Sequence, residues 1–112
     1  KRKINILLLG ITFKENCNDT RNSLVIDVYK KLSKNYLVEV YDPLVNSNFF
    51  LKNKIKYLKK IIKFSYDVVI LAVPHNYFIN LGTKKLRKYM AKNSFIFDLK
   101  GVLSKENDIE YI

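Results

Sequence analysis

A polar stretch near the start of the chain holds side chains of the types that bind phosphate. Residues 10–23 read GITFKENCNDTRNS and contain Lys14, Arg21 and several hydroxyl and amide groups. A helix is expected to begin directly after this stretch, and helix N-termini and cations both attract phosphate. Two interpretations are equally open on these grounds: an anion-binding loop, or a surface connection in which Asp and Asn side chains form turns.

The same stretch lacks the glycines of a dinucleotide-binding turn. The fingerprint G-x-G-x-x-G lets the backbone approach a pyrophosphate, and only Gly10 is present here. This domain is therefore not expected to be the main NAD-binding half of a protein. Asp42 lies where such a fold places an acid that holds ribose hydroxyls, although ordinary Asp-Pro turn chemistry is the favoured interpretation.

The chain has one cysteine, Cys17, and one histidine, His75. A single cysteine excludes an internal disulfide framework and a multi-cysteine zinc site, and no metal site is predicted. A Cys–His nucleophile pair needs a contact in space that the sequence does not show, so a passive thiol is the favoured interpretation of Cys17. His75 could approach a ligand, and a loop histidine satisfied by hydrogen bonds is the favoured alternative.

Two strands and a helix must position these residues. Residues 4–9 form a short, nearly continuous apolar run that ends at Gly10, as expected for a fully buried strand. Apolar residues then recur at a spacing of three and four, which predicts a helix capped by Asn22 or Ser23. Residues 37–41 form a second strand, which ends at an Asp-Pro pair. This order of strand, loop, helix and strand is the repeat unit of a parallel sheet.

The remainder of the chain continues the alternation of strands and helices. The predicted elements are a short strand at 55–58, a short helix at 58–64, a strand at 67–73, an amphipathic helix at 83–92, a strand at 94–97 and the beginning of a last strand at 109. Together they predict an α/β fold: a three-layer Rossmann-like domain with a mainly parallel sheet of five or six strands. Residues 1–112 are expected to form a single domain.

A ligand site is expected at the carboxyl ends of the strands. In open α/β sheets ligands bind beyond those ends. The segments that follow the predicted strands are 10–21, 42–43, 74–78 and 98–101. Any site should therefore be built from these four loops.

The formal net charge is +11, from 21 basic and 10 acidic residues. Only three of the basic residues are arginines, whereas nucleic-acid sites favour arginine for its bidentate contacts. Codon bias of an AT-rich genome, together with solubility, is the favoured explanation, and a dedicated polyanion-binding surface is the alternative. Neither a signal peptide nor an apolar run long enough to span a membrane is visible. Both ends of the chain look cut from something longer.

Several motifs resemble the third domain of the UDP-glucose/GDP-mannose dehydrogenase family. Residues 10–16 (GITFKEN), the pattern Asp-x-Arg-Asn-Ser at 19–23 and the segment Val-Tyr-Asp-Pro at 40–43 carry the resemblance. Ala-Val-Pro-His at 72–75 and Phe-Asp-Leu-Lys-Gly-Val at 97–102 follow in the same order. The resemblance covers essentially the whole chain, and the variants at 14–17 and 98–101 look nearest to the UDP-N-acetylhexosamine 6-dehydrogenase branch.

The resemblance implies a domain of an NAD-dependent enzyme that oxidises the C6 alcohol of a UDP-sugar to a carboxylate in two steps. In the family an N-terminal Rossmann domain holds NAD, and a central helical region supplies the dimer interface and a catalytic cysteine in a glycine-rich motif. That motif is absent here, so Cys17 is not the nucleophile and the fragment alone is expected to be inactive. The implied setting is a cytoplasmic bacterial homodimer or higher oligomer that serves surface polysaccharide or capsule biosynthesis.

The resemblance also implies roles for individual residues. Phe13 and Lys14 match positions beside the UDP moiety, and Lys100 falls where the family places a basic residue near the substrate nucleotide. Arg21 matches an arginine that reaches the phosphates of the cofactor. No catalytic residue is assigned within this chain. The alternative function is a freestanding basic α/β module that binds nucleic acid or another polyanion.

Overall fold

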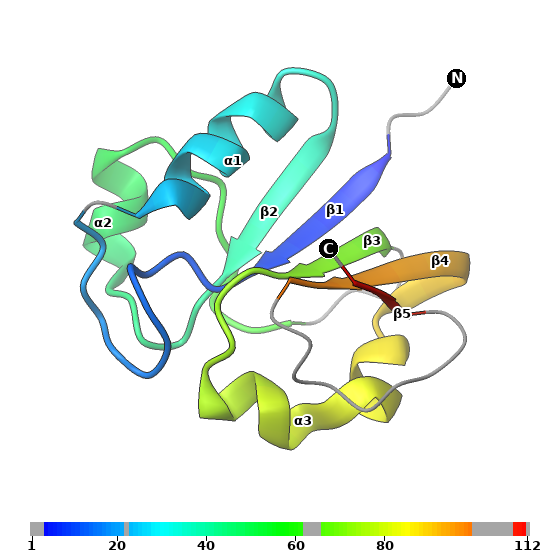
Figure 1. The fold of residues 1–112 in the computed structure, drawn as a ribbon. Helices are drawn as coiled ribbons and strands as arrows, with labels where there is room; N and C mark the ends of the chain where they lie inside the picture. The colour runs from blue at the N-terminus through cyan, green and yellow to red at the C-terminus, as the bar shows by residue number, and fades with distance from the viewer. Residues whose placement is uncertain (1–3, 22, 62–65, 100–108, 112) are drawn as a thin grey trace.

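The computed structural model describes residues 4–21, 23–61, 66–99 and 109–111. In chain order the elements are β1 (Asn5–Leu9), α1 (Leu24–Ser33), β2 (Leu37–Tyr41), α2 (Ser47–Lys52), β3 (Tyr66–Leu71), α3 (Asn76–Arg87), β4 (Met90–Asp98) and β5 (Ile109–Tyr111) (Figure 1). Among the described residues no helix is long and apolar enough to cross a membrane.

The strands form one parallel sheet in the order β2-β1-β3-β4-β5. β1 pairs with β2 on one side and with β3 on the other, and Leu8 lies opposite both Val40 and Ile70. The chain therefore winds outward from β1 in one direction to β2 and in the other to β3, β4 and β5. The point where the winding reverses lies between β1 and β3, and the crevice beyond their carboxyl ends is where such sheets bind ligands.

Helices cover both faces of this sheet (Figure 1). On one face Ile6, Leu8 and Val40 pack with Tyr29 of α1 and Phe50 of α2. The opposite face has a core of strand and α3 side chains that includes Leu7, Leu9, Val69, Leu71, Phe78 and Leu86. Because β1 is buried on both faces, its sequence is a continuous apolar run rather than an alternating one. The three-layer α/β prediction is confirmed, with five strands in the described part of the chain.

The middle of the chain differs from the prediction. The helix expected at 58–64 is wrong: residues 58–61 are irregular, and 62–65 lie outside the described residues. The helix of this region is α2, which Asn46 caps by accepting the N–H of Asn48 at 2.6 Å. The ring of Phe50 stacks on that of Tyr57 at 4.7 Å, so a tertiary contact holds α2 in place. The strand expected at 55–58 is reduced to a single bridge between Val40 and Tyr57.

The last helix begins earlier than predicted. α3 starts at Asn76, directly after His75, and not at residue 83. Gly82 interrupts it with φ 73° and ψ 168°, a conformation that other residues rarely adopt, which explains why only the second half showed a helical pattern. Met90, predicted to lie on the helix, instead begins β4 and pairs with Tyr66.

Candidate functional site

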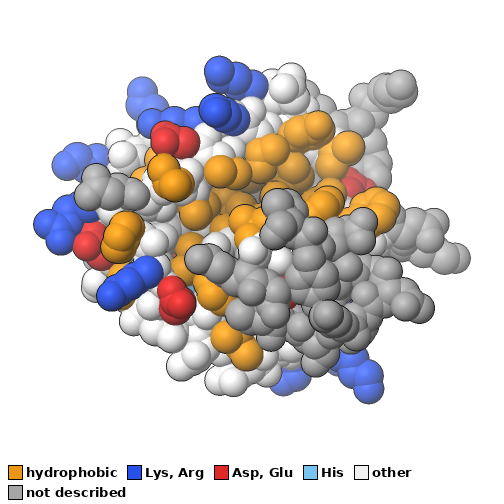
Figure 2. Space-filling view, in the orientation of Figure 1, with side chains coloured by type: hydrophobic (Ala, Val, Ile, Leu, Met, Phe, Trp, Pro, Cys, Tyr) orange, Lys and Arg blue, Asp and Glu red, His pale blue; other side chains and the backbone are white. Residues whose placement is uncertain are grey.

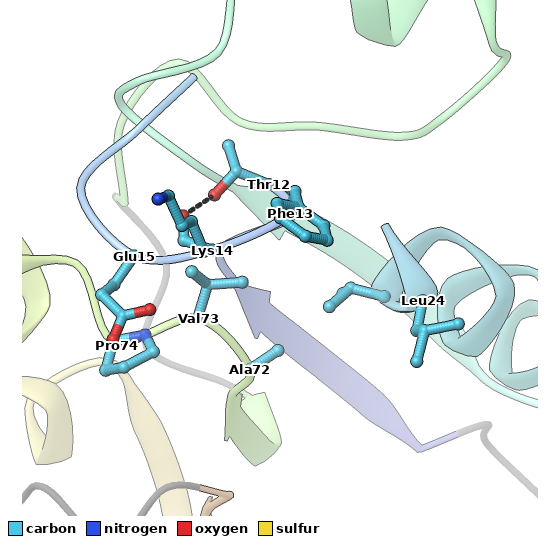
Figure 3. A pocket seen from close by; sticks show the side chains of 9 residues that line it. Thr12, Phe13, Lys14, Glu15, Leu24, Ala72, Val73 and Pro74 are labelled. Atoms are coloured by element: carbon cyan, nitrogen blue, oxygen red, sulfur yellow. Dashed lines mark hydrogen bonds between the residues drawn. The ribbon is translucent and has the colours of Figure 1, made fainter. Parts of the chain in front are cut away.

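A cavity of about 300 Å³ lies beyond the carboxyl ends of β1 and β3, at the point where the strand order reverses (Figure 3). One wall is the loop after β1, a second is the segment after β3, and a third is the first turn of α1. The lining residues are Thr12, Phe13, Lys14, Glu15, Leu24, Val25, Ala72, Val73 and Pro74. Two of the four predicted loops therefore form the cavity.

Gly10 ends β1 at a close approach to the segment after β3. Its φ is +91°, and a Cβ placed on it would lie 2.6 Å from the Cβ of Val73. Its N–H donates to the carbonyl oxygen of Tyr41 at 3.0 Å. The glycine is thus explained by packing, and its N–H is already used inside the sheet.

Phe13 and Lys14 lie in the loop that bounds the cavity (Figure 3). Phe13 is 56% exposed although it is a large apolar side chain, and Lys14 is exposed beside it. Hydrogen bonds within the loop hold their backbone. The N–H of Phe13 donates to the carbonyl of Asp19, and the hydroxyl of Thr12 donates to the carbonyl of Lys14 at 2.8 Å. The phenyl ring of Phe13 and the ammonium group of Lys14 are therefore both exposed on a loop whose backbone is held by hydrogen bonds.

A buried pair of polar side chains, His75 and Asp42, lies beneath this loop. His75 is 1% exposed and Asp42 is 4% exposed. The backbone N–H of Asn16 donates to His75 Nδ1 at 2.8 Å, so Nδ1 is the acceptor of a neutral imidazole and Nε2 carries the hydrogen. Nε2 lies 3.0 Å from Asp42 Oδ2 and 3.4 Å from the hydroxyl of Thr12.

These contacts decide between the alternatives left open for three residues. Asp42 Oδ2 also accepts the N–H of Ile11 and Oδ1 accepts that of Leu44, which supports the turn chemistry favoured for this Asp-Pro pair. His75 is the satisfied loop histidine. Cys17 Sγ donates to the carbonyl of Lys14 at 3.4 Å, whereas the imidazole is engaged by Asn16 and Asp42, which supports a passive thiol.

Arg21 lies at the far end of the same loop, with its side chain 86% exposed. Its guanidinium donates through Nε and Nη2 to the two carboxylate oxygens of Asp19, at 3.0 and 3.1 Å. The hydrogen bond from Arg21 lowers the pKa of the Asp19 carboxyl below its usual value, and the same contact raises the pKa of Arg21. The hydroxyl of Ser23, at the helix start, contacts the carbonyl of Thr12 at 3.4 Å and ties α1 to the loop.

Two predicted residues cannot be placed, and several residues that line the cavity were not predicted. Lys100 and Asn22 lie outside the described residues. Leu24 and Val25 line the cavity, although the spacing of apolar residues in this stretch predicts only burial in the helix core. Ala72 and Val73 also line it, and they lie in the apolar run that predicts a strand at 67–73. These four residues could have been found only from their place in the fold, because each follows or faces the end of a central strand.

A cavity at the reversal point of a parallel, doubly wound sheet defines a ligand-binding α/β domain. Residues 7–105 match the UDP-glucose/GDP-mannose dehydrogenase family, UDP binding domain. The chain therefore belongs to this family and corresponds to its UDP-binding domain, as its motifs predicted.

Similar proteins agree in sequence and in fold. The chain is 36% identical to a UDP-N-acetyl-D-glucosamine 6-dehydrogenase of Pseudomonas aeruginosa, over 95% of this chain and 27% of that protein. It is 36% identical to the protein CapL of Staphylococcus aureus, over 88% of this chain and 24% of that protein. The UDP-N-acetyl-mannosamine dehydrogenase Cap5O of Staphylococcus aureus superposes with a TM-score of 0.74 at 26% identity, over 98% of this chain and 26% of that one. The chain thus spans about a quarter of the length of the curated relatives.

Proposed function

We propose that this chain binds the UDP part of a UDP-sugar for an NAD-dependent UDP-sugar 6-dehydrogenase, with a UDP-N-acetylhexosamine as the substrate. The observation that carries the proposal is the cavity at the reversal point of the sheet, bounded by Phe13 and Lys14, in a chain of this family. The relatives named as UDP-N-acetyl-sugar dehydrogenases support the choice of sugar. The reaction takes place in the bacterial cytoplasm. Its product is a uronic acid, which is used to make surface polysaccharide.

Each proposed site residue has a role that its chemistry suits. Lys14 neutralises the diphosphate as a point charge, and the exposed ring of Phe13 offers an apolar surface to the nucleotide. Lys100 adds a second basic group near the substrate nucleotide. Arg21 reaches the phosphates of NAD, which the N-terminal domain of the same enzyme holds. When bound there, NAD accepts the hydride, and the central domain supplies the nucleophile and the contact between subunits.

The test is the affinity of this chain for UDP, measured by isothermal titration calorimetry. Lys14→Ala should weaken UDP binding by about tenfold or more, the size expected for a hydrogen bond to a charged group. Lys14→Arg should restore the affinity only in part, because the guanidinium is larger and planar. The unfolding midpoint should barely change, since Lys14 is exposed.

The matched control is Lys85→Ala. Lys85 is an exposed lysine of α3, which packs on the sheet face opposite α1. Removing it changes the net charge by the same amount and should leave the UDP affinity unaltered. Equal effects of the two substitutions would show that Lys14 acts only through the overall charge, and the proposed site would be wrong.

A further inference from the structure

We propose that His75 and Asp42 are positioning residues that hold the Phe13–Lys14 loop in the shape that binds the nucleotide. The inference rests on the proposed function, because it concerns the same loop. Neither side chain faces the cavity: both are buried beneath the loop, and the lining includes neither of them. Their effect on a ligand must therefore pass through the residues that they hold.

The pair contacts the loop on both sides of the exposed segment 13–15. Before it, the N–H of Ile11 donates to Asp42 Oδ2 at 2.8 Å. After it, the N–H of Asn16 donates to His75 Nδ1 at 2.8 Å. The two acceptors are joined to each other by the 3.0 Å contact between His75 Nε2 and Asp42 Oδ2. One buried unit thus fixes the two ends of the segment that carries Phe13 and Lys14.

Asn16 gives this arrangement a definite backbone shape. Its φ is 58°, in the left-handed region that Asn tolerates better than most residues. Its Oδ1 accepts the N–H of Asn76, the first residue of α3, at 2.7 Å. Asn16 is therefore held by its backbone on His75 and by its side chain on the helix start. The loop after β1 is thus bound to the segment that joins β3 to α3.

The polar pair does not strengthen the core in the way that apolar side chains would. A buried carboxylate and imidazole cost desolvation, and well-packed apolar residues often replace such groups without loss of stability. Besides each other, the two side chains contact backbone or hydroxyl groups of residues 11, 12, 16 and 44, and the first three of these lie in the loop after β1. Most polar contacts of His75 and Asp42 are therefore with the loop after β1.

Two substitutions of His75 separate positioning from folding. In His75→Asn, the amide oxygen lies near the place of Nδ1 and can still accept the N–H of Asn16. In His75→Gln, the longer amide reaches the place of Nε2 and can serve Asp42, but it leaves Asn16 without its acceptor. Each variant keeps one of the two contacts, so both should lose a similar amount of stability.

The readouts are the UDP affinity by calorimetry and the hydrogen-exchange rate of the Asn16 amide by NMR. His75→Gln should weaken UDP binding and speed this exchange by about tenfold, as expected for a donor left unpaired. His75→Asn should stay close to the wild type in both. The control is Ile96→Val in β4, a fully buried residue on the far face, which should lower stability mildly and leave both readouts unchanged.

The outcomes distinguish this inference from the proposed function. If the wild-type chain binds UDP and His75→Gln binds it equally well, the positioning role is wrong and the proposed function stands. If His75→Asn and His75→Gln lose affinity alike, in proportion to their loss of stability, the role is structural and the inference is also overturned. If the wild-type chain does not bind UDP, the proposed function fails and this inference fails with it.

Discussion

Two cations of the loop after β1 differ in their surroundings. Arg21 is exposed and held by both carboxylate oxygens of Asp19, whereas Lys14 lines the cavity beside Phe13. An arginine with a planar pair of donors suits a phosphate that arrives from outside this domain. A lysine at the cavity suits a diphosphate bound inside it. The proposed roles therefore give the two residues different ligands, the diphosphate of the UDP-sugar for Lys14 and the cofactor for Arg21.

The prediction for Arg21 concerns the complete dehydrogenase in which this domain is proposed to act. Arg21→Ala should raise the apparent KM for NAD more than that for the UDP-sugar, in steady-state kinetics with each substrate varied. Folding should hardly change, because the Asp19–Arg21 pair is exposed and such pairs contribute little stability. Unchanged NAD kinetics together with a lower unfolding midpoint would show that Arg21 serves only to shape the loop.

At the residue scale the sequence could identify the loop but not the unit beneath it. Phe13 and Lys14 follow a recognisable strand, so their place at its carboxyl end could be predicted. Asp42 and His75 are 33 residues apart, and their contact depends on β1 lying between β2 and β3. No local pattern encodes that strand order, so the sequence alone leaves the roles of both residues open.

Among the elements, β1 and the segment after β3 meet at Gly10. Gly10→Ala should destabilise the fold in urea unfolding, since overpacking costs about 1–3 kcal/mol and the positive φ adds strain. Gly82→Ala is the matched control: its φ is +73°, but nothing lies within 4 Å of the place that a Cβ would take. The Gly82→Ala variant should therefore lose stability through backbone strain alone. Equal losses in the two variants would contradict the packing explanation.

β2 and β3 are also joined across β1 by a hydrogen bond from the Tyr66 hydroxyl to Glu39 Oε1 at 2.6 Å. Burial, aided by this bond, raises the pKa of Tyr66 well above its usual value. The unfolded chain therefore releases this proton near pH 10 while the folded chain keeps it, so stability should fall as the pH rises above about 10. Urea unfolding at neutral and alkaline pH should show a smaller alkaline loss for Tyr66→Phe than for the wild type. An identical loss in both would contradict this assignment.

The element predictions failed where tertiary contacts decide the structure. α2 has a capping Asn46 in its sequence, but its six residues are held in place by the stacking of Phe50 on Tyr57. Gly82 interrupts the helical period of α3, so the sequence pattern predicts only the second half of this helix. By contrast, β1, α1 and β2 have clear apolar patterns and short connections, so their existence and order could be predicted.

For the whole molecule, the net charge of +11 supports the main alternative to a specific UDP site, which is binding of polyanions such as nucleic acid. Figure 2 shows Lys and Arg side chains of the described residues around the rim of one face, with apolar side chains at its centre. We expect UDP to bind more tightly than uncharged uridine at physiological salt, and single-stranded RNA to bind weakly, since polyanion binding falls steeply with salt. Calorimetry with the three ligands checks this. Tight RNA binding without UDP binding would favour the polyanion module.

The 112 residues alone should show no reduction of NAD with any UDP-sugar. The turn after β1 lacks the glycines of the dinucleotide fingerprint, and the glycine-rich cysteine motif is also absent from the sequence. Absorbance of NADH in a mixture of the chain, NAD and UDP-sugar checks this expectation. Turnover by the chain alone would overturn the division of roles between this domain and the rest of the enzyme.

The most direct test of the central claim is an NMR titration of the isotope-labelled chain with UDP. We predict that the amide shifts of residues 12–15 and 72–73 move most, because these residues line the cavity between the ends of β1 and β3. Amides on α3, across the sheet, should stay in place. Absence of any shift at saturating UDP, or shifts centred on α3, would contradict the claim that this crevice binds the nucleotide.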